Sequence, residues 1–132
     1  MNDKTPEIYS AMTFEYNKDE DAEMAVKEFT SMGVSDIKVV KPQCSSITKI
    51  SIATVKNKRL WDIDEALTIM FSRVDNYLNK IKEITKKYNG KICIDIAFYE
   101  YGTYPALLFS GENMKKIHYL EADISIDPYS MS

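Results

Sequence analysis

The sequence predicts an α+β protein built on a single, mostly antiparallel sheet of about six strands, with the helices packed on one face. Several segments alternate apolar and polar residues, which is typical of strands with one buried and one solvated face. Other segments repeat apolar residues at steps of three and four, which indicates amphipathic helices. With 132 residues, 45% of them hydrophobic and 28% charged, the chain has the size and composition of one globular domain, residues 1–132.

The first half of the chain predicts a strand, a helix and two further strands. Residues 8–16 alternate strictly and predict a half-buried strand. Asn17 and Glu20 have the spacing of a capping box, which indicates that a helix starts there. Its apolar stripe stops before Gly33, a residue favoured just beyond a helix C-terminus. The two strands that follow are expected at 36–41 and 47–55.

Residues 62–89 predict the longest element, a single amphipathic helix. Asp62 and Glu65 form a helix-start signal, and their negative charge suits the positive end of the helix dipole. Such a helix would be roughly 40 Å long and is expected to end at Asn89. One apolar stripe runs along it. The stripe residues expected to be buried are Leu67, Phe71, Val74, Leu78 and Ile81.

The last third of the chain predicts a hairpin, a short helix and a final strand. Residues 91–101 alternate, and Gly102 begins a two-residue turn signal. Residues 104–109 therefore predict the return strand of the hairpin. The short helix starts at Ser110, and the final strand stops at Pro128, which has no backbone N–H for a strand ladder. The predicted order of elements is β-α-β-β-α-β-β-α-β.

The residue types that usually carry chemistry are sparse. No Gly-x-Gly pair is present, so the sequence offers no glycine-rich loop to hold a phosphate. His118 is the one histidine, and Cys44 and Cys93 are 49 residues apart, so no metal-ligand cluster is visible. We expect Cys93 to be a small buried hydrophobe, Cys44 an exposed thiol and His118 a surface residue. These observations predict a protein without a metal or cofactor that is not an enzyme.

Charge and hydropathy narrow the classes of partner. A net charge of −3 argues against nucleic acid, because phosphate binding needs a basic surface. No apolar run approaches the roughly 18 residues of a membrane span, and the polar N-terminus shows no signal peptide. Two cysteines give no disulfide framework. We therefore expect a cytoplasmic protein that binds neither nucleic acid nor membrane.

Tyrosines and carboxylates are interleaved between residues 95 and 129. Tyrosine supplies a large amphipathic contact area, and carboxylates complement a basic surface. Tyrosines also suit sheet positions without any partner, so a purely structural role is the alternative interpretation. The candidate partner-binding residues are Asp95, Tyr99, Glu100, Tyr101, Tyr104, Tyr119, Glu121, Asp123, Asp127 and Tyr129.

Three motifs in the C-terminal half are similar to those of a known family. They are Tyr104-Pro-Ala-Leu-Leu-Phe-Ser110, Met114-Lys-Lys-Ile117 and Ile124-Ser-Ile-Asp127-Pro-Tyr129. Together with the long helix, they resemble the bacterial domain of unknown function 4279 over about residues 61–130. The resemblance implies a small bacterial cytoplasmic α+β domain with no established activity.

The leading hypothesis is a non-enzymatic bacterial binding protein. Small acidic bacterial domains look like immunity proteins, which neutralise a toxin by binding it directly. The expected partner is then a protein, such as a basic toxin domain encoded nearby. One alternative is a small hydrolase or ligand-binding domain that uses Asp95, Asp123 and His118. The other is a structural homodimer joined through an exposed sheet edge.

Overall fold

The computed structural model describes residues 3–43 and 45–131, and Cys44, expected to be an exposed thiol, lies outside them. The described chain contains five strands and four α-helices, with a 3₁₀ turn, η1 (Asp75–Tyr77), between two of the helices. In chain order the elements are β1 (Glu7–Tyr16), α1 (Asp19–Met32), β2 (Lys38–Val40), β3 (Thr48–Arg59), α2 (Ile63–Ser72), α3 (Leu78–Lys87), β4 (Lys91–Glu100), α4 (Gly111–Tyr119) and β5 (Asp123–Ser130).

The five strands form one sheet in the order β2-β3-β1-β4-β5. β1 lies at its centre and pairs with β3 on one side and with β4 on the other. All neighbouring strands are antiparallel except β4 and β5, which run parallel and are connected through α4. The structure thus confirms the predicted α+β fold with a mostly antiparallel sheet.

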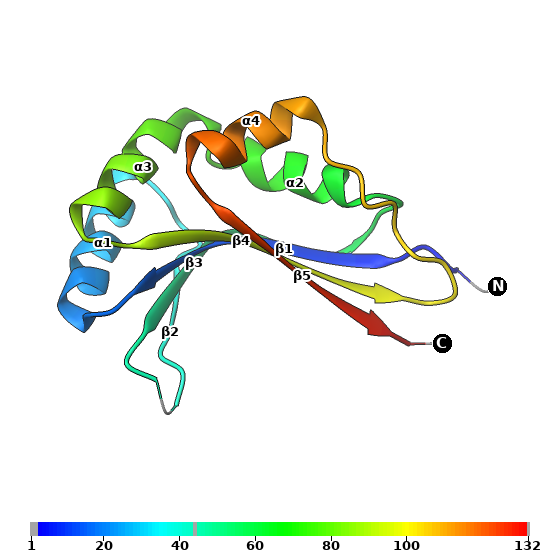
Figure 1. Ribbon diagram of the computed structural model, residues 1–132, viewed down its shortest axis with the longest axis horizontal. Coiled ribbons are helices and arrows are strands. Elements are labelled where there is room, and N and C mark those ends of the chain that lie inside the picture. Colours follow the sequence, from blue (N-terminus) through cyan, green and yellow to red (C-terminus); the bar gives the residue numbers. More distant parts are fainter. Residues whose placement is uncertain (1–2, 44, 132) are drawn as a thin grey trace.

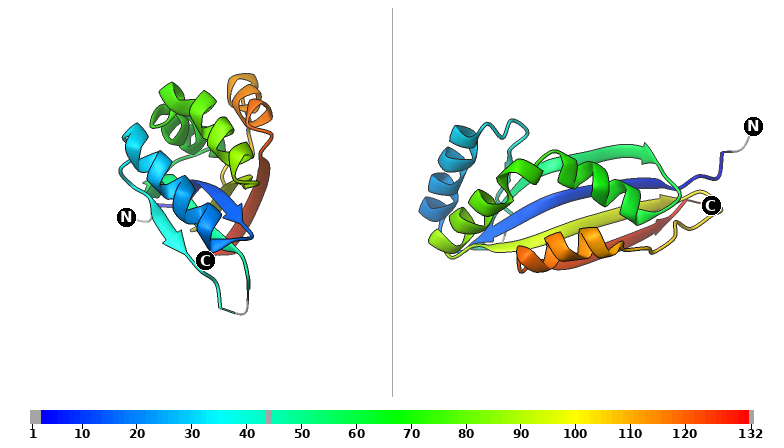
Figure 2. Two further views of the ribbon diagram at one scale, coloured as in Figure 1. Left: turned by 90° about the vertical axis from the view of Figure 1, so that its left-hand side faces the viewer. Right: turned by 90° about the horizontal axis from the view of Figure 1, so that it is seen from above.

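The helices gather on one side of this sheet, as predicted (Figures 1 and 2). α2 packs over β1 and β3, α1 covers one end of the sheet beside α3, and α4 lies next to α2. No helix covers the other face of the sheet in the described chain, and the loop between β2 and β3 extends away from it (Figure 1). One broad sheet face is therefore open to a partner.

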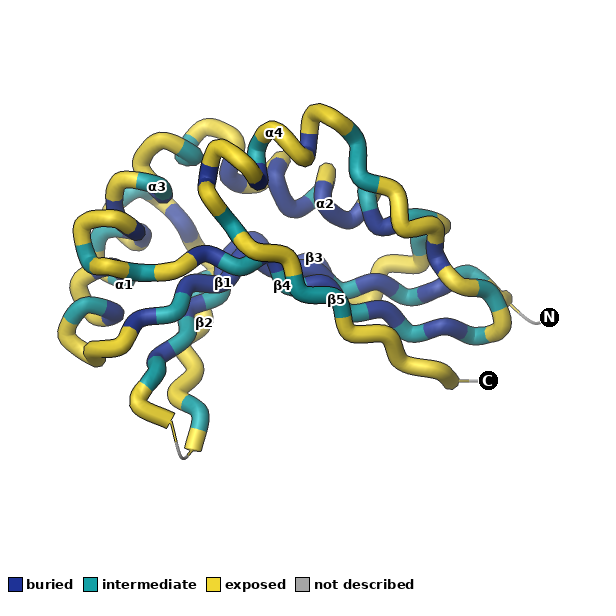
Figure 3. Tube along the Cα trace, viewed as in Figure 1, coloured by how far each residue is buried: buried dark blue, intermediate teal, exposed yellow. Residues whose placement is uncertain are grey.

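The core lies between the helices and the inner face of the sheet (Figure 3). Even-numbered residues of β1 and β4 point into it, because successive side chains of a strand point to opposite faces. At one end, the ring of Phe14 lies 4.9 Å from that of Phe29 on α1, centroid to centroid. The apolar stripe predicted over residues 62–89 does face the core. Four of its five named residues are buried, namely Leu67, Phe71, Val74 and Ile81, and Leu78 is half-buried.

β3 carries two extra residues relative to β1, and each forms a β-bulge. The pairing register shifts between Ile8 and Ser10 and again between Ser10 and Met12. Within this stretch Ala53 and Asn57 have positive φ angles of 54° and 56°. Because bulges increase the local twist and bend the strand, β3 curves more strongly here than a regular strand would.

The prediction of a single helix over 62–89 is wrong, because the segment forms two helices joined by η1. α2 ends at Ser72 and α3 begins at Leu78. Asp75 and Asn76 occupy the break, and their short polar side chains compete with the helix for backbone hydrogen bonds. The break lets α2 cover β1 and β3 while α3 packs beside α1. No helix of the described chain is both long and apolar enough to cross a membrane.

Residues 104–109 do not form the predicted return strand, so the sheet has five strands rather than about six. β5 occupies the position beside β4, and Pro105 has no N–H to offer a strand ladder. Within the described chain the segment makes one isolated bridge, between Ala106 and Asp62. The observed order of elements is therefore β-α-β-β-α-α-β-α-β.

The start of α1 also differs from the prediction. Its N-cap is Lys18 rather than Asn17, and no side chain caps it. Instead, the carboxylate of Asp19 in the first turn accepts hydrogen bonds from Lys41 and, at 2.5 Å, from the hydroxyl of Thr48. A tertiary contact to β3 therefore replaces the local capping box.

Gly90 follows α3 and lies against the ring of Tyr16, where an added Cβ would sit 2.5 Å from Cε1. Tyr16 is 1% exposed, so its ring has little room to move. We expect Gly90→Ala to lower the free energy of unfolding in urea by about 1–3 kcal/mol, as overpacked cores do. Gly111→Ala is the matched control, because a Cβ there meets no atom within 4 Å. Equal stability of the two variants would show that the Tyr16 ring moves aside without cost.

Candidate partner-binding site

Half of the candidate residues gather on the uncovered face of β4 and β5. Odd-numbered residues of both strands point to this face, because their even-numbered neighbours point toward the core. The parallel register places Ala97 beside Asp127 and Tyr99 beside Tyr129. We name this surface the tyrosine–carboxylate strip, and its members are Asp95, Tyr99, Asp123, Asp127 and Tyr129.

Two tyrosines of the strip stack on each other. The ring centroids of Tyr99 and Tyr129 are 5.1 Å apart, and their planes differ by 17°. Such pairs contribute about 0.5–1.5 kcal/mol beyond their buried area, so each ring holds the other in place. Tyr129 is nevertheless 48% exposed on the edge strand. The pair is a preorganised aromatic surface that a partner can reach.

The carboxylates of the strip differ in how far they are neutralised. Asp123 forms an ion pair with Lys91, with 2.9 Å between Oδ2 and Nζ. Asp95 and Asp127 form no ion pair with any residue that the structure describes. The uncompensated negative charge of the strip therefore comes from one carboxylate on β4 and one on β5.

A polar cleft of about 310 Å³ lies on the β2–β3 side of the same face. Two lysines, Lys38 and Lys56, and one carboxylate, Asp36, line it together with Tyr9. Neither lysine is ion-paired within the described ranges. Asp36 also forms no ion pair among the described residues, so the unpaired charges of the cleft are two positive and one negative, whereas those of the strip are two negative. The uncovered face is therefore polarised, from a net positive cleft near β2 and β3 to the negative strip on β4 and β5.

Tyr9 belongs to the cleft, and Cys93 lies within the strip region, where it pairs with Asp123 and donates to Asp95. Burial, and then the charge of Asp95, raise the pKa of Tyr9, so its hydroxyl stays neutral at pH 7. Burial, and then the hydrogen bond to Asp95, raise the pKa of the Cys93 thiol to about 12, so it is not a nucleophile at neutral pH. Cys93 is half-buried rather than buried as expected. Tyr9 was not among the candidates, although the alternation of residues 8–16 already placed it on this face.

Glu100 belongs to the turn after β4 and not to the strip. Its side chain is buried, because its even position points it to the inner face of the sheet. The carboxylate accepts hydrogen bonds from the N–H of Gly102 at 2.6 Å and from the hydroxyl of Ser130 at 3.1 Å. Glu100 therefore joins the turn to β5 instead of facing a partner.

Tyr101 and Tyr104 lie beyond the end of β4. The hydroxyl of Tyr101 donates to Glu7 at 3.0 Å, and the guanidinium of Arg59 lies 4.3 Å from its ring centroid. Tyr101 thus holds the turn to β1 and β3. Tyr104 is exposed and touches Phe98 edge-on, with 6.0 Å between ring centroids. Neither tyrosine adds to the strip.

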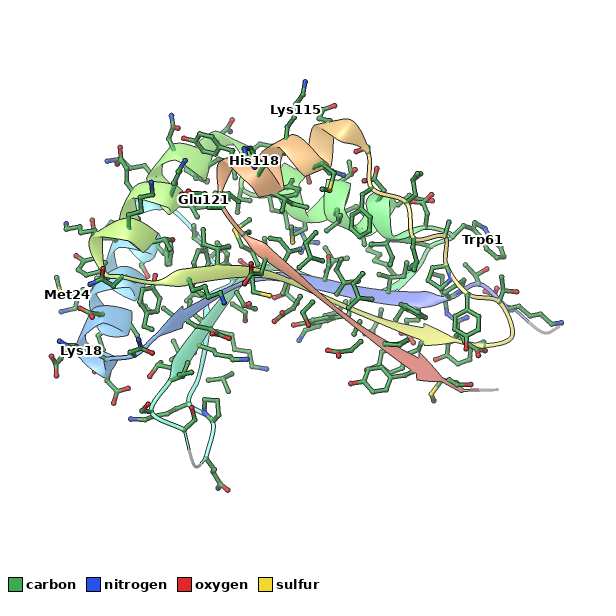
Figure 4. The ribbon with its side chains drawn as sticks, in the orientation of Figure 1. Lys18, Met24, Trp61, Lys115, His118 and Glu121 are labelled. Carbon is green, nitrogen blue, oxygen red and sulfur yellow. The ribbon has the colours of Figure 1, made fainter. Side chains whose placement is uncertain are left out.

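Tyr119 and Glu121 lie in the helix layer, on the other side of the sheet. The hydroxyl of Tyr119 donates to Asn79, and Lys82 Nζ lies 4.4 Å from its ring centroid. Glu121 forms an ion pair with Lys86 at 3.4 Å, and Figure 4 shows it where α4 leads into β5. Both candidates connect α4 to α3, so their contacts are structural.

The residues considered for a hydrolase are not brought together. His118 is exposed on α4 in the helix layer, as expected for a surface residue (Figure 4). Asp95 and Asp123 lie on the uncovered face, so the sheet stands between them and the imidazole. Over residues 3–43 and 45–131, no three His, Cys, Asp or Glu side chains are grouped closely enough to hold a metal ion.

A partly buried polar cluster that the sequence did not indicate joins α2 to α4. The carboxylate of Asp64 accepts hydrogen bonds from the N–H of Ser110 at 2.8 Å and from the amide of Asn113 at 2.9 Å. Burial raises the pKa of Asp64, but these hydrogen bonds outweigh it and hold the pKa below its usual value. Asn113 also donates to Thr68 at 3.0 Å. The cluster fixes α4, and α4 in turn positions the start of β5.

The fold and this surface define a small α+β domain whose sheet keeps one polarised, tyrosine-bearing face open. The family model of the domain of unknown function DUF4279 matches residues 45–131, and the chain belongs to that family. The match confirms the resemblance found over residues 61–130 and extends it to include β3. No curated protein and no solved structure matches the chain.

Proposed function

We propose that the protein is a non-enzymatic binding protein whose tyrosine–carboxylate strip binds a basic partner protein. We further propose that the partner is a bacterial toxin, which this contact neutralises in the cytoplasm. The observation that supports the proposal is the stacked Tyr99–Tyr129 pair beside two carboxylates without a cation. Aromatic anchors dominate the energy of protein interfaces, while charges mainly set association rate and orientation. Covering the surface of a toxin requires contact area and no catalytic group.

The polarity of the uncovered face favours one docking orientation. A basic ridge on the partner would lie over Asp95 and Asp127, and an acidic group would lie near Lys38 and Lys56. The reversed orientation would bring like charges together, which costs several kcal/mol in close contacts (roughly, from). The strip therefore supports a specific complex rather than general attraction to any cation.

The alternative of a homodimer joined through a sheet edge receives less support. A twofold antiparallel pairing of two β5 strands about Ser125 would set Asp123 of one copy against Asp127 of the other, and like charges directly opposite destabilise strand pairs. Pro128 removes one donor from the same edge. The opposite edge strand, β2, is only three residues long. Both edges thus carry features that discourage edge-to-edge pairing.

Truncating the exposed tyrosine anchor should shorten the lifetime of the complex. We expect Tyr129→Ala to speed dissociation about 30-fold, since truncating an anchor typically costs about 2 kcal/mol. Surface plasmon resonance against the product of the neighbouring gene measures the effect. Tyr119→Ala is the matched control, because Tyr119 is also an exposed tyrosine but lies in the helix layer. Equal dissociation rates for both variants and the wild type would place the contact elsewhere.

The same measurement separates the effect of charge, which appears in the association rate, from the effect of aromatic contact, which appears in the dissociation rate. Asp127→Asn should lower the association rate at low salt, and added salt should abolish the difference because it screens exposed charges. Asp123→Asn should have a smaller effect, since Lys91 already neutralises that carboxylate. Co-expression with the neighbouring gene then tests neutralisation. If the product binds the strip but does not impair growth, the toxin part of the proposal is wrong while the binding part stands.

A further inference from the structure

The polar cleft owes its side chains to a β-bulge in β3. Ser51 lies between two buried residues, so its side chain points to the uncovered face. In a regular strand, Ala53 and Val55 would share this face with Ser51. Ala53 instead has a positive φ of 54°, and the pairing register shifts beside it. Thr54 and Lys56 therefore line the cleft, whereas Val55 is buried.

The bulge is strained, and two other segments hold it in place. Alanine seldom adopts a positive φ, because its Cβ then crowds the backbone. The N–H of Thr54 donates to Asp36 at 3.0 Å, and the guanidinium of Arg73 donates to the carbonyl of Thr54. Strain of this kind clusters at functional sites, where bulges re-aim side chains. The bulge therefore favours a functional role for the side chains that it turns into the cleft.

The cleft presents five hydrogen-bonding side chains that the described chain leaves unused. They are two ammonium groups, which form no ion pair, and three hydroxyls, which form no hydrogen bond: Lys38, Lys56, Tyr9, Ser51 and Thr54. All five can donate a proton to an acceptor. A ligand that uses them must therefore be rich in acceptor oxygens.

The charged groups around the cleft give such a ligand an orientation. Three cations and two carboxylates line the cleft or act on a residue that lines it, namely Lys38, Lys56, Arg73, Asp36 and Asp95. The surroundings are thus positive by one charge, although the whole chain carries −3. Asp36 accepts the Thr54 N–H through Oδ2, and its Oδ1 accepts no hydrogen bond from the described chain. An anionic group suits the lysines, and a hydroxyl suits Asp36.

A phosphate group matches these donors better than a carboxylate does. No arginine lines the cleft in the described chain, and the planar fork of arginine is the group that binds carboxylates in pairs of hydrogen bonds. Lysine ammonium groups are point charges, and separate hydroxyls beside them suit a tetrahedral group with several acceptor oxygens. A phosphate monoester carries a charge of about −1.5 to −2 at pH 7, which two lysines balance.

The volume of the cleft leaves room for more than the phosphate. At about 310 Å³ it lies at the lower end of the range for small-molecule sites. The half-buried ring of Tyr9 supplies an apolar wall for a compact body. We infer that the polar cleft binds a small phosphorylated sugar, with the phosphate on Lys38 and Lys56 and a hydroxyl of the sugar on Asp36. The inference concerns the isolated chain and does not rest on the proposed partner.

Isothermal titration calorimetry with glucose 6-phosphate tests the site. The wild type should bind it about 10-fold more tightly than glucuronate, which carries a carboxylate on a similar ring. Lys38→Gln and Lys56→Gln should each weaken binding about 10-fold, because each removes a charge-assisted hydrogen bond. Lys115→Gln is the matched control, since it removes the same charge from an exposed lysine on α4, in the helix layer (Figure 4), and should bind like the wild type.

Asp36→Asn tests the contact to the sugar. Asparagine keeps an oxygen for the Thr54 N–H but removes the negative charge, so the preference for glucose 6-phosphate over inorganic phosphate should fall about 3-fold. An unchanged preference would overturn the proposed orientation. Equal affinity for glucuronate, or lysine variants that bind like the wild type, would overturn the phosphate site. The partner's acidic group is the other source of anionic oxygens for the same lysines. If glucose 6-phosphate does not bind, while Lys38→Gln slows association of the neighbouring gene product, the cleft belongs to that partner and the inference is wrong.

Discussion

A fragment that spans only the family match, residues 45–131, is expected not to fold. It lacks β1, which lies at the centre of the sheet and pairs with both β3 and β4. Without β1, these two strands lose their shared neighbour, and the core loses the side chains that β1 contributes. The largest of these are fully buried: Ile8, Met12, Phe14 and Tyr16. The fragment lacks β2 as well, so β3 keeps no neighbour and only the parallel β4–β5 pair remains, and two strands alone are at best marginally stable in water.

Circular dichroism and urea unfolding of the purified fragment check this expectation. The full chain should unfold cooperatively, whereas the fragment should show no cooperative transition and poor chemical-shift dispersion. Met12→Asp in the full chain is the companion variant, because it buries an unpaired charge in β1 without removing any residue. A fragment that unfolds cooperatively would show that β1 is dispensable and that β3 and β4 find another arrangement.

The second large effect is expected for Phe71→Ala. Phe71 is fully buried on α2, which packs over β1 and β3, so truncation leaves a cavity beneath the helix. Removal of a buried phenylalanine typically lowers the free energy of unfolding by about 3–5 kcal/mol, through lost burial and the cavity together. Urea denaturation measures the loss. Met24→Ala is the control on exposed α1 surface and should change little. A loss below about 1 kcal/mol would contradict the burial of Phe71.

Periodicity predicted most elements because it records which side of each segment faces the core. Residues 8–16 alternate because β1 has a buried and an open face, and the structure has β1 at Glu7–Tyr16. The same rule failed for 62–89, since an apolar stripe shows that residues face the core but not that the helix remains straight. It failed again for 104–109, because a strand needs an edge to pair with, and β5 occupies that edge.

The candidate site was predicted in part, and what was missed depends on contacts between distant residues. Alternation placed Asp95 and Asp123 on the solvated face, where the structure has them. It could not show that Lys91 neutralises Asp123, because this pairing follows from the register of β5 beside β4. Nor could it separate Tyr119 from Tyr129, since both are exposed tyrosines and only the fold assigns them to different layers. Charge and composition identify residue types, whereas topology decides which of them share a surface.

The central position of β1 has a consequence for synthesis in the cell. β1 emerges from the ribosome before both of its partners, and one of them, β4, ends at Glu100, which is 84 residues after Tyr16. At about 5–20 residues per second, the nascent chain waits roughly 4–17 s before that pairing can form. During this interval the edge of β1 that pairs with β4 stays unpaired, even after β3 has been made. Non-local pairing of this kind slows folding, and newly made chains should therefore depend on chaperones more than the finished protein does.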